Sequence, residues 1–241
     1  MEARDRIICA LDVDNAYRAL HLVEKLQEHV GVFKVGLELV TATGVQIFAK
    51  LREAGARRLF FDAKLHDIPN TVTGAMRGVV GLGAWCVTVH ATGGRAMLSA
   101  AVQAAQSEAE AAGVPRPKVL AVTVLTSINE TMLREELCVD LPVAEYVGKL
   151  AKMAREAGCD GVIASPHEIA VVRAAVPANG FLVVTPGVRP LGAEQGDQAR
   201  VMTPEQAIRL GASHLVIGRP IVASPDPVEA AREIADEIAG L

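Results

Sequence analysis

The sequence is poor in aromatic residues, has no basic run and has no long apolar run. Aromatic residues make up 3% of its 241 residues, although 51% of all residues are hydrophobic. The apolar mass is therefore aliphatic, which favours parallel strands with covering helices. A formal charge of −4 without a basic cluster argues against binding to nucleic acid. The longest uninterrupted apolar run, from Ile7 to Leu11, is far shorter than a membrane span requires.

The sequence also lacks paired cysteines and a targeting segment. Charged residues occupy most of positions 2–6, so we expect no signal peptide there. The four cysteines, Cys9, Cys86, Cys138 and Cys159, form no C-x-x-C pair and match no zinc-binding spacing. We therefore expect reduced thiols that are buried or inert, in a cytoplasmic protein.

One unit recurs along the whole chain: a short apolar run, a turn and then an amphipathic stretch. The stretch 142–158 illustrates the last part, because its apolar residues recur at helical spacing while its charged residues take the other faces. Eight such units are expected to give eight strands, each followed by a helical segment. The apolar runs are 6–13, 32–37, 58–65, 85–91, 118–126, 161–165, 181–188 and 214–221.

Helix-boundary residues agree with this division. Asp226-Pro227 and Thr203-Pro204 each offer an N-cap followed by a proline at the first helical position, and Gly113 stands where a helix should end. Alternating strands and helices predict a parallel sheet with right-handed crossovers. Eight units in this length predict a single α/β domain over residues 1–241, a (β/α)8 TIM-type barrel. The alternative, a doubly wound open sheet, is disfavoured because no G-x-G-x-x-G or Walker A motif follows any run.

Charged residues stand at the ends of the first three predicted strands. These are Asp12, Lys34, Asp62, Lys64 and, in the following loop, Asp67. Active sites of such barrels lie at the C-terminal ends of the strands, and a strand period of two directs Asp62 and Lys64 to one side. Lys34, Asp62, Lys64 and Asp67 are expected to form an alternating array, which would hold the lysines protonated and the carboxylates ionised. The alternative is an ion-pair network that only ties the second and third strands together.

A second cluster follows the seventh and eighth strands and suits a phosphate. Residues 185–189 include Pro186 and end with Arg189, and residues 217–220 contain Gly218 and Arg219. Glycines let backbone N–H groups approach an anion, and arginine offers a bidentate fork. The glycine-punctuated segment 190–201 between them is predicted to close over the site as a lid. The alternative is an ordinary surface loop with solvated arginines.

Two further features near the predicted strand ends are weaker. The hydroxyls of Thr126 and Ser127 follow the fifth strand and either bind a substrate or cap the next turn. His66 and His90 lie near the charged residues and receive no role.

Several motifs together resemble the orotidine 5′-phosphate decarboxylase family in its bacterial form. The resemblance begins with Phe61-Asp62-Ala63-Lys64-Leu65-His66-Asp67-Ile68-Pro69-Asn70-Thr71, which is similar to the family signature. Motifs at 10–12, 33–36, 124–127, 185–189, 196–198 and 217–220 also match in order and span nearly the whole chain.

The resemblance implies a homodimer that converts orotidine 5′-phosphate to uridine 5′-phosphate and CO2, the last step of uridine monophosphate biosynthesis, without a metal or an organic cofactor. By this resemblance Lys64 would donate the proton, Asp62 would lie near the substrate carboxylate and Lys34 would join the array. Asp12 would bind ribose hydroxyls. The remaining positions carried over are Asp67, Ile68 and Thr71 for the partner's site, Thr126, Ser127 and Pro186 for the nucleotide, and Arg189, Gln198, Gly218 and Arg219 for the phosphate.

Three other functions are alternatives to this one. The 3-keto-L-gulonate 6-phosphate decarboxylases share the D-x-K-x-x-D pattern but hold Mg²⁺ partly through a glutamate on the second strand, where this chain has the cationic Lys34. A Schiff-base aldolase needs a neutral amine, which flanking carboxylates disfavour. A catalytically inactive barrel that binds a nucleotide as a sensor is the non-enzymatic alternative.

Overall fold

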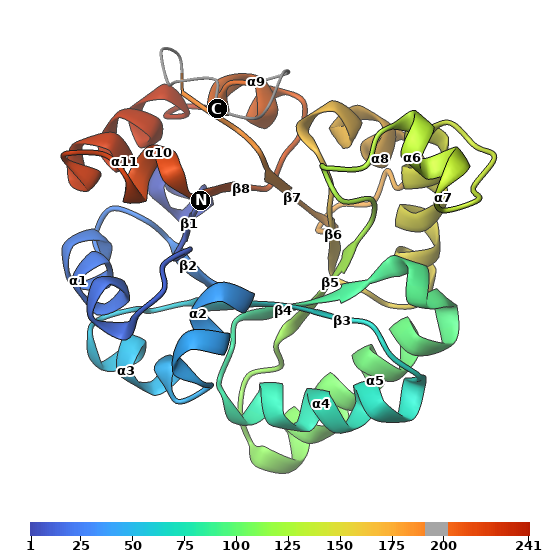
Figure 1. The fold of residues 1–241 in the computed structure, drawn as a ribbon, viewed down its shortest axis with the longest axis horizontal. Helices are drawn as coiled ribbons and strands as arrows, with labels where there is room; N and C mark the ends of the chain where they lie inside the picture. The colour runs from blue at the N-terminus through green and yellow to red at the C-terminus, as the bar shows by residue number, and fades with distance from the viewer. Residues whose placement is uncertain (191–201) are drawn as a thin grey trace.

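Eight parallel strands close into a barrel in the computed structural model, which describes residues 1–190 and 202–241 (Figure 1). The strands follow chain order around the barrel, and the last pairs with the first. The prediction of a (β/α)8 barrel is therefore confirmed. The strands are β1 (Ile7–Ala10), β2 (Val32–Val35), β3 (Leu59–Leu65), β4 (Cys86–His90), β5 (Lys118–Val122), β6 (Gly161–Ile163), β7 (Leu182–Pro186) and β8 (His214–Ile217).

Helices surround the strands and form the outer layer of the molecule (Figure 1). Within the described residues, no helix has both the length and the apolar character needed to cross a bilayer. The α-helices are α1 (Ala16–Leu26), α2 (Leu37–Thr43), α3 (Ile47–Glu53), α4 (Pro69–Gly81), α5 (Gly94–Ala112), α6 (Glu130–Glu135), α7 (Val143–Glu156), α8 (Ile169–Ala175), α9 (Pro204–Arg209), α10 (Arg219–Val222) and α11 (Pro227–Glu237). Short 3-10 turns occur at η1 (Ala3–Arg6), η2 (Ala91–Gly93) and η3 (Pro166–Glu168).

The predicted helix boundaries hold where the caps were identified. The Asp226 carboxylate accepts hydrogen bonds from two backbone N–H groups of the first turn of α11. Thr203 and Gln206 form a reciprocal capping box at the start of α9. Gly113 ends α5 in the left-handed conformation, with φ of 65°, which a glycine adopts without a Cβ clash.

Alternating side chains divide the strands between two apolar regions. One face of each strand packs against the helices, and this shell holds most of the buried residues. The other face points into the barrel, where aliphatic side chains, a phenylalanine and a cysteine form a packed interior rather than a pore. The interior cluster consists of Ile8, Ala10, Val32, Phe60, Cys86, Leu120, Val184 and Val216.

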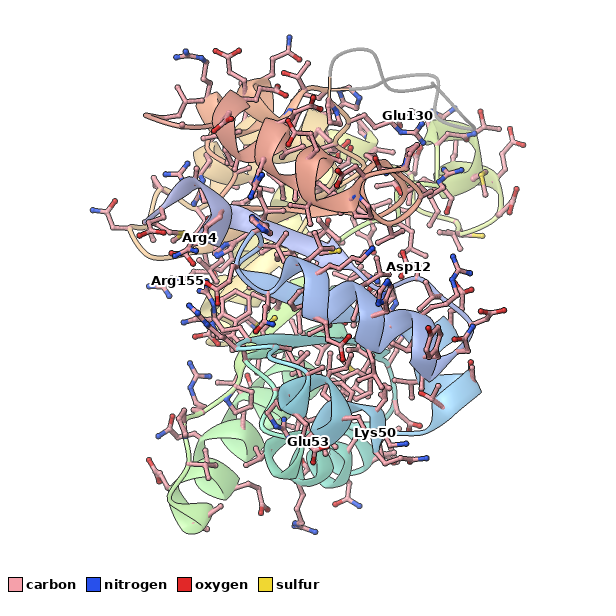
Figure 2. The ribbon with its side chains drawn as sticks, turned by 90° about the vertical axis from the view of Figure 1, so that its left-hand side faces the viewer. Arg4, Asp12, Lys50, Glu53, Glu130 and Arg155 are labelled. Carbon is pink, nitrogen blue, oxygen red and sulfur yellow. The ribbon has the colours of Figure 1, made fainter. Side chains whose placement is uncertain are left out.

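The two ends of the barrel differ in what they can bind. Figure 2 places Asp12, which follows β1, and Glu130, which begins α6, at one end. Arg4 and Arg155, which precede β1 and β6, lie at the other end. The first end therefore carries the C-terminal ends of the strands, where this fold builds its active sites.

The cysteines match the expectation except at one position. All four are free, and Cys9, Cys86 and Cys159 are buried. Burial raises the pKa of both the Cys9 and the Cys159 thiol to about 12. Cys138 is exposed instead, because it lies in the loop between α6 and α7 rather than in a strand.

A buried histidine lies at the opposite end of the barrel from Asp12. His214 begins β8, is 2% exposed, and its ring centroid lies 5.3 Å from that of Trp85. Neither ring nitrogen has a hydrogen-bond partner in the described part of the chain. Burial, followed by the positive charges of Arg58 and Arg6, lowers the pKa of His214 from 6.5 to about 4. The folded protein therefore holds this imidazole neutral.

We expect this histidine to destabilise the fold in acid. Between pH 6.5 and about 4 the unfolded chain binds a proton at His214 and the folded chain does not. The free energy of unfolding is thus retained above pH 6.5. It falls as the pH drops through this window, by about 3 kcal/mol in total. His214→Leu should flatten the pH dependence of the urea-unfolding free energy over that range, whereas the exposed control His21→Leu should not. Equal slopes in the wild type and His214→Leu would contradict this assignment.

Candidate active site

A cavity of about 460 Å³ opens at the C-terminal ends of the strands. Its size lies within the range of small-molecule sites. Polar and charged residues line one part of it: Asp12, Lys34, Asp62, Lys64, Thr126, Ser165, Arg189 and Arg219. Apolar residues line the rest: Leu37, Phe60, Val122, Val124, Leu125, Ile163, Val188 and Val216.

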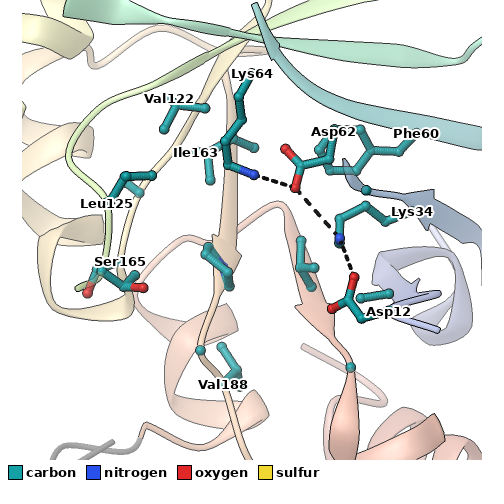
Figure 3. A pocket seen from close by; sticks show the side chains of 18 of the residues that line it. Asp12, Lys34, Phe60, Asp62, Lys64, Val122, Leu125, Ile163, Ser165 and Val188 are labelled. Atoms are coloured by element: carbon teal, nitrogen blue, oxygen red, sulfur yellow. Dashed lines mark hydrogen bonds and ion pairs between the residues drawn. The ribbon is translucent and has the colours of Figure 1, made fainter. Parts of the chain in front are cut away.

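Four of the predicted charges form a continuous chain along one wall of this cavity (Figure 3). Lys34 Nζ donates to Asp12 Oδ1 at 2.9 Å and lies 3.6 Å from Asp62 Oδ2. Lys64 Nζ donates to the same Asp62 oxygen at 2.7 Å. Asp62 thus bridges the two ammonium groups, and positive and negative charges alternate as predicted. The members differ at one position, because Asp12 pairs with Lys34 whereas the predicted fourth member, Asp67, lies outside this chain of charges in the described structure.

Strand register explains why residues far apart in sequence meet here. Ala10 pairs with Lys34 across β1 and β2, and Lys34 pairs with Phe60 across β2 and β3. Asp12 and Asp62, each two residues beyond one of these pairs, therefore flank Lys34. Gly36 provides space for the ammonium, because a Cβ at that position would lie 2.9 Å from Lys34 Nζ.

The array is partly dry, which strengthens its interactions. The Lys34 side chain is 10% exposed and that of Asp62 is 13% exposed, whereas Lys64 is 32% exposed and reaches into the cavity. Burial alone would raise the pKa of Asp62, but Lys34, Lys64 and two hydrogen bonds outweigh it and hold that pKa below its usual value. Asp62 is therefore ionised at neutral pH and offers a negative charge to both ammonium groups.

Strand β3 is not regular where it carries these residues. Phe61 pairs with Val87 and Leu65 with Val89, so three residues of β3 lie opposite a single residue of β4. Lys64 has a φ of 49°, in the left-handed region that a residue with a side chain rarely adopts. Asp62 and Lys64 do point to one side as predicted, but a bulge brings them together rather than a simple strand period.

Thr88, the residue of β4 opposite this bulge, was not predicted from the sequence. It is fully buried on β4; its hydroxyl donates to Asp62 Oδ1 and accepts from the Lys64 N–H, each at 2.9 Å. The available signal was slight: a threonine within the apolar run 85–91, in phase with Cys86 and His90. Ser165, at the end of β6, also lines the cavity without having been predicted.

The predicted phosphate residues follow β7 and β8, which stand across the closed barrel from β3 and β4. Pro186, Arg189, Gly218 and Arg219 all line it. The Arg189 N–H donates to the Met202 carbonyl at 3.1 Å, which joins the chain on either side of residues 191–201. Gln198 and nearly all of the predicted lid lie outside the described residues.

The hydroxyls predicted after β5 divide between two environments. Thr126 lines the cavity, as expected for a residue that contacts a ligand. Ser127 is exposed and is not among the described residues that line the cavity.

The structure of one chain does not bring Asp67, Ile68 and Thr71 to the array. All three are exposed, at the start of α4 or just before it, and Ile68 is 66% exposed. The Asp67 carboxylate accepts a hydrogen bond from the Ile68 N–H at 2.6 Å. Their expected contribution to a partner's site stays a prediction.

The two unassigned histidines form a pair beside the array. The His66 and His90 rings lie 5.2 Å apart at 35° to each other. Burial, then His66 and Lys64, lower the pKa of His90 despite the opposing effect of Asp62. His90 is therefore neutral at pH 7 and cannot add a third positive charge beside Lys64.

The charged wall suits an anionic organic molecule better than a cation. Within residues 1–190 and 202–241 no three His, Cys, Asp or Glu side chains are grouped for metal binding. Here two ammonium groups interleave with the two carboxylates. A fixed ammonium in a water-poor site stabilises negative charge that develops on a bound molecule, and it can also deliver a proton.

Comparisons with known proteins agree with this geometry. The sequence profile of the family described as "Orotidine 5′-phosphate decarboxylase / HUMPS family" matches residues 5–234. The chain is 53% identical over 238 residues to an orotidine 5′-phosphate decarboxylase of Moorella thermoacetica, covering 99% of this chain and 94% of the relative. It is 46% identical to that of Syntrophomonas wolfei, with 99% of both chains covered. The crystal structure of the Lactobacillus acidophilus enzyme superposes with a TM-score of 0.82 at 40% identity, covering 96% of this chain and 98% of that one.

Proposed function

The chain belongs to the orotidine 5′-phosphate decarboxylase / HUMPS family, and we propose on that basis that it decarboxylates orotidine 5′-phosphate to uridine 5′-phosphate, the last step in uridine monophosphate biosynthesis. One observation carries this proposal: the Asp12–Lys34–Asp62–Lys64 chain along one wall of the cavity. This arrangement supports the proposal, because a fixed ammonium can stabilise the negative charge that the reaction develops. We propose that residues 1–241 form one catalytic domain.

Different parts of the cavity bind the phosphate, the ribose and the pyrimidine of the nucleotide. Arg189 and Arg219, with the backbone at Gly218, hold the phosphate, to which guanidinium groups are well matched. The Asp12 carboxylate accepts hydrogen bonds from the ribose hydroxyls. The pyrimidine then lies between the apolar wall, which includes Val122 and Ile163, and the charged wall.

Lys64 carries out the chemical step in this arrangement. The bond between the ring carbon and the carboxylate breaks, CO2 leaves, and the electron pair stays on the ring carbon. The Lys64 ammonium stabilises this carbanion and then transfers its proton to it, which yields uridine 5′-phosphate. The resulting neutral amine regains a proton from water. Asp62 holds Lys64 in place and crowds the substrate carboxylate, which favours its departure.

Phosphate binding supports this step from a distance. The phosphate does not react, so its contacts supply binding energy that orders the ring against Lys64. Placing the arginines across the cavity from Lys64 fits that division of labour.

We propose that the reaction needs neither a metal nor an organic cofactor. The magnesium-dependent sugar-phosphate decarboxylases are not favoured as an alternative, because Lys34 occupies the strand position where they hold the metal and its ammonium repels a cation. The direct test is a spectrophotometric assay of orotidine 5′-phosphate decarboxylation with and without a chelator. Turnover unaffected by the chelator is expected; loss of activity on chelation would favour the sugar-phosphate enzymes.

We also propose that two copies of the chain complete each other's sites in a cytoplasmic homodimer. The exposed position of Asp67, Ile68 and Thr71 after β3 supports this arrangement, because they neither pack in the core nor line their own chain's cavity. Asp67 of the partner subunit then adds a carboxylate near Lys64. The four free thiols suit a reducing compartment.

Mixing two inactive variants tests the shared site. Lys64→Ala and Asp67→Ala homodimers should each have very low activity. After subunit exchange, one site of each mixed dimer has an intact Lys64 and an intact partner carboxylate, so roughly a quarter of all sites should regain wild-type turnover. Sedimentation and a tagged pull-down would establish that exchange has occurred. Mixed dimers without recovered activity would rule out a contribution from the partner.

A further inference from the structure

A buried threonine links the two central residues of the charged array from the neighbouring strand. Thr88 lies on β4 with no exposed surface, and its hydroxyl makes two contacts at once. As a donor it reaches Asp62 Oδ1 at 2.9 Å, and as an acceptor it receives the Lys64 backbone N–H at 2.9 Å. Asp62 uses its other oxygen, Oδ2, for the two lysines.

The position of Thr88 in the barrel gives these contacts a structural purpose. The β3–β4 register shifts between Phe61 and Leu65, and Thr88 is the residue of β4 opposite the shift. The Lys64 N–H therefore has the Thr88 hydroxyl as its acceptor where a regular parallel ladder would offer a backbone carbonyl. The side chain thus replaces a ladder bond at the bulge.

The backbone of Lys64 needs such support. Its φ of 49° lies in the left-handed region, which disfavours a residue with a long side chain. Strained conformations of this kind persist only where the surroundings hold them. Without the hydroxyl, Lys64 would relax toward an ordinary strand conformation, and its ammonium would move relative to Asp62 and the cavity.

We propose that Thr88 is a positioning residue for the decarboxylation, setting the geometry of Lys64 and Asp62 through a hydroxyl that donates to one and accepts from the other. The inference rests on the proposed function. Thr88 does not line the cavity and so acts only through these two residues. A hydroxyl is required in this role, because a valine of the same shape offers neither the donor nor the acceptor.

Three variants separate positioning from general packing. Thr88→Val keeps the shape and removes both hydrogen bonds, whereas Thr88→Ser keeps the hydroxyl. Thr123→Val is the matched control, because Thr123 is also buried and its hydroxyl donates to the Ile163 carbonyl at 2.9 Å, away from the array. Each variant is assayed for kcat and KM, and for affinity toward uridine 5′-phosphate, which lacks the reacting carboxylate.

We expect Thr88→Val to lower kcat by roughly 10- to 100-fold, the range for a small displacement of a reacting group. Its affinity for uridine 5′-phosphate should stay within about threefold of the wild type, since binding of the phosphate and ribose is unchanged. Thr88→Ser should recover most of the rate, and Thr123→Val should resemble the wild type. A Thr88→Val enzyme with normal kcat, or equal losses in Thr88→Val and Thr123→Val, would overturn the proposal.

A second measurement does not depend on turnover. Hydrogen exchange at the Lys64 amide should accelerate in Thr88→Val and remain slow in Thr88→Ser and Thr123→Val, because only the first loses the acceptor of that N–H. A wild-type protein without decarboxylase activity would defeat the proposed function while this exchange pattern still held. Unchanged Lys64 exchange in Thr88→Val would defeat the positioning role whatever the activity.

Discussion

Lys64→Ala should reduce kcat/KM for orotidine 5′-phosphate by at least about 10⁴-fold. General acid catalysis contributes roughly 10²- to 10⁴-fold, and a preorganised electrostatic contact contributes roughly 10²- to 10³-fold. In the proposed mechanism Lys64 supplies both functions, because its ammonium both stabilises the carbanion and donates the proton. Truncation to alanine removes the two together, and no other described lysine except Lys34 lines the cavity.

The same variant should still fold and should bind uridine 5′-phosphate with nearly the wild-type affinity. The Lys64 side chain is 32% exposed and opens into the cavity, so its removal leaves no sealed void. Affinity for uridine 5′-phosphate, measured by calorimetry, should change only modestly because the phosphate residues are untouched. The exposed Lys50→Ala on α3 is the control for loss of a positive charge. Near-normal turnover in Lys64→Ala would contradict the catalytic role proposed for Lys64.

Asp62→Asn is the change with the second-largest expected effect, a fall in kcat/KM of roughly 10²- to 10³-fold. Asparagine keeps the size of the side chain, but it removes the charge and replaces one accepting oxygen with an NH2 donor. The ammonium groups of Lys34 and Lys64 would then face each other without the anion that lies between them. Their mutual repulsion would displace the Lys64 ammonium from the position in which Asp62 holds it.

Steady-state kinetics would measure this effect. The loss in Asp62→Asn should fall mainly on kcat, because the carboxylate that holds the Lys64 ammonium in place is gone. Affinity for uridine 5′-phosphate should not weaken, since the product has no carboxylate near Asp62. Asp14→Asn, an exposed carboxylate at the same end of the barrel, serves as the control. A wild-type rate in Asp62→Asn would show that the charge between the lysines is dispensable.

These two predictions concern residues that the sequence identified in advance. Charges at strand ends stand out in an aliphatic sequence, because burying a charge requires a partner or a function. Local spacing was enough to place Asp12, Lys34, Asp62 and Lys64 at one rim. It was also enough to place Arg189 and Arg219 after the last two strands, at the edge of the cavity.

Local spacing could not show how the rim is held together. A sequence period of two assumes a regular strand, whereas β3 carries a bulge opposite Thr88. A bulge depends on how two strands pair, and the threonine that supports it is separated from Lys64 by 24 positions in the chain. Likewise Asp67 and Ser127 follow strands as closely as their neighbours do, yet the backbone turns both away from the cavity of their own chain.

Periodicity, helix caps and charges within apolar runs are local properties, so the sequence alone predicts the barrel, its eight repeated units and most of the charged side chains that line the cavity. Which of these side chains touch depends on how the strands pair. Closure of the barrel sets the register that brings Lys34 between Asp12 and Asp62, and pairing of β3 with β4 places the Thr88 hydroxyl beneath Lys64. Contacts of this kind arise between strands, and the spacing of residues along one strand does not encode them.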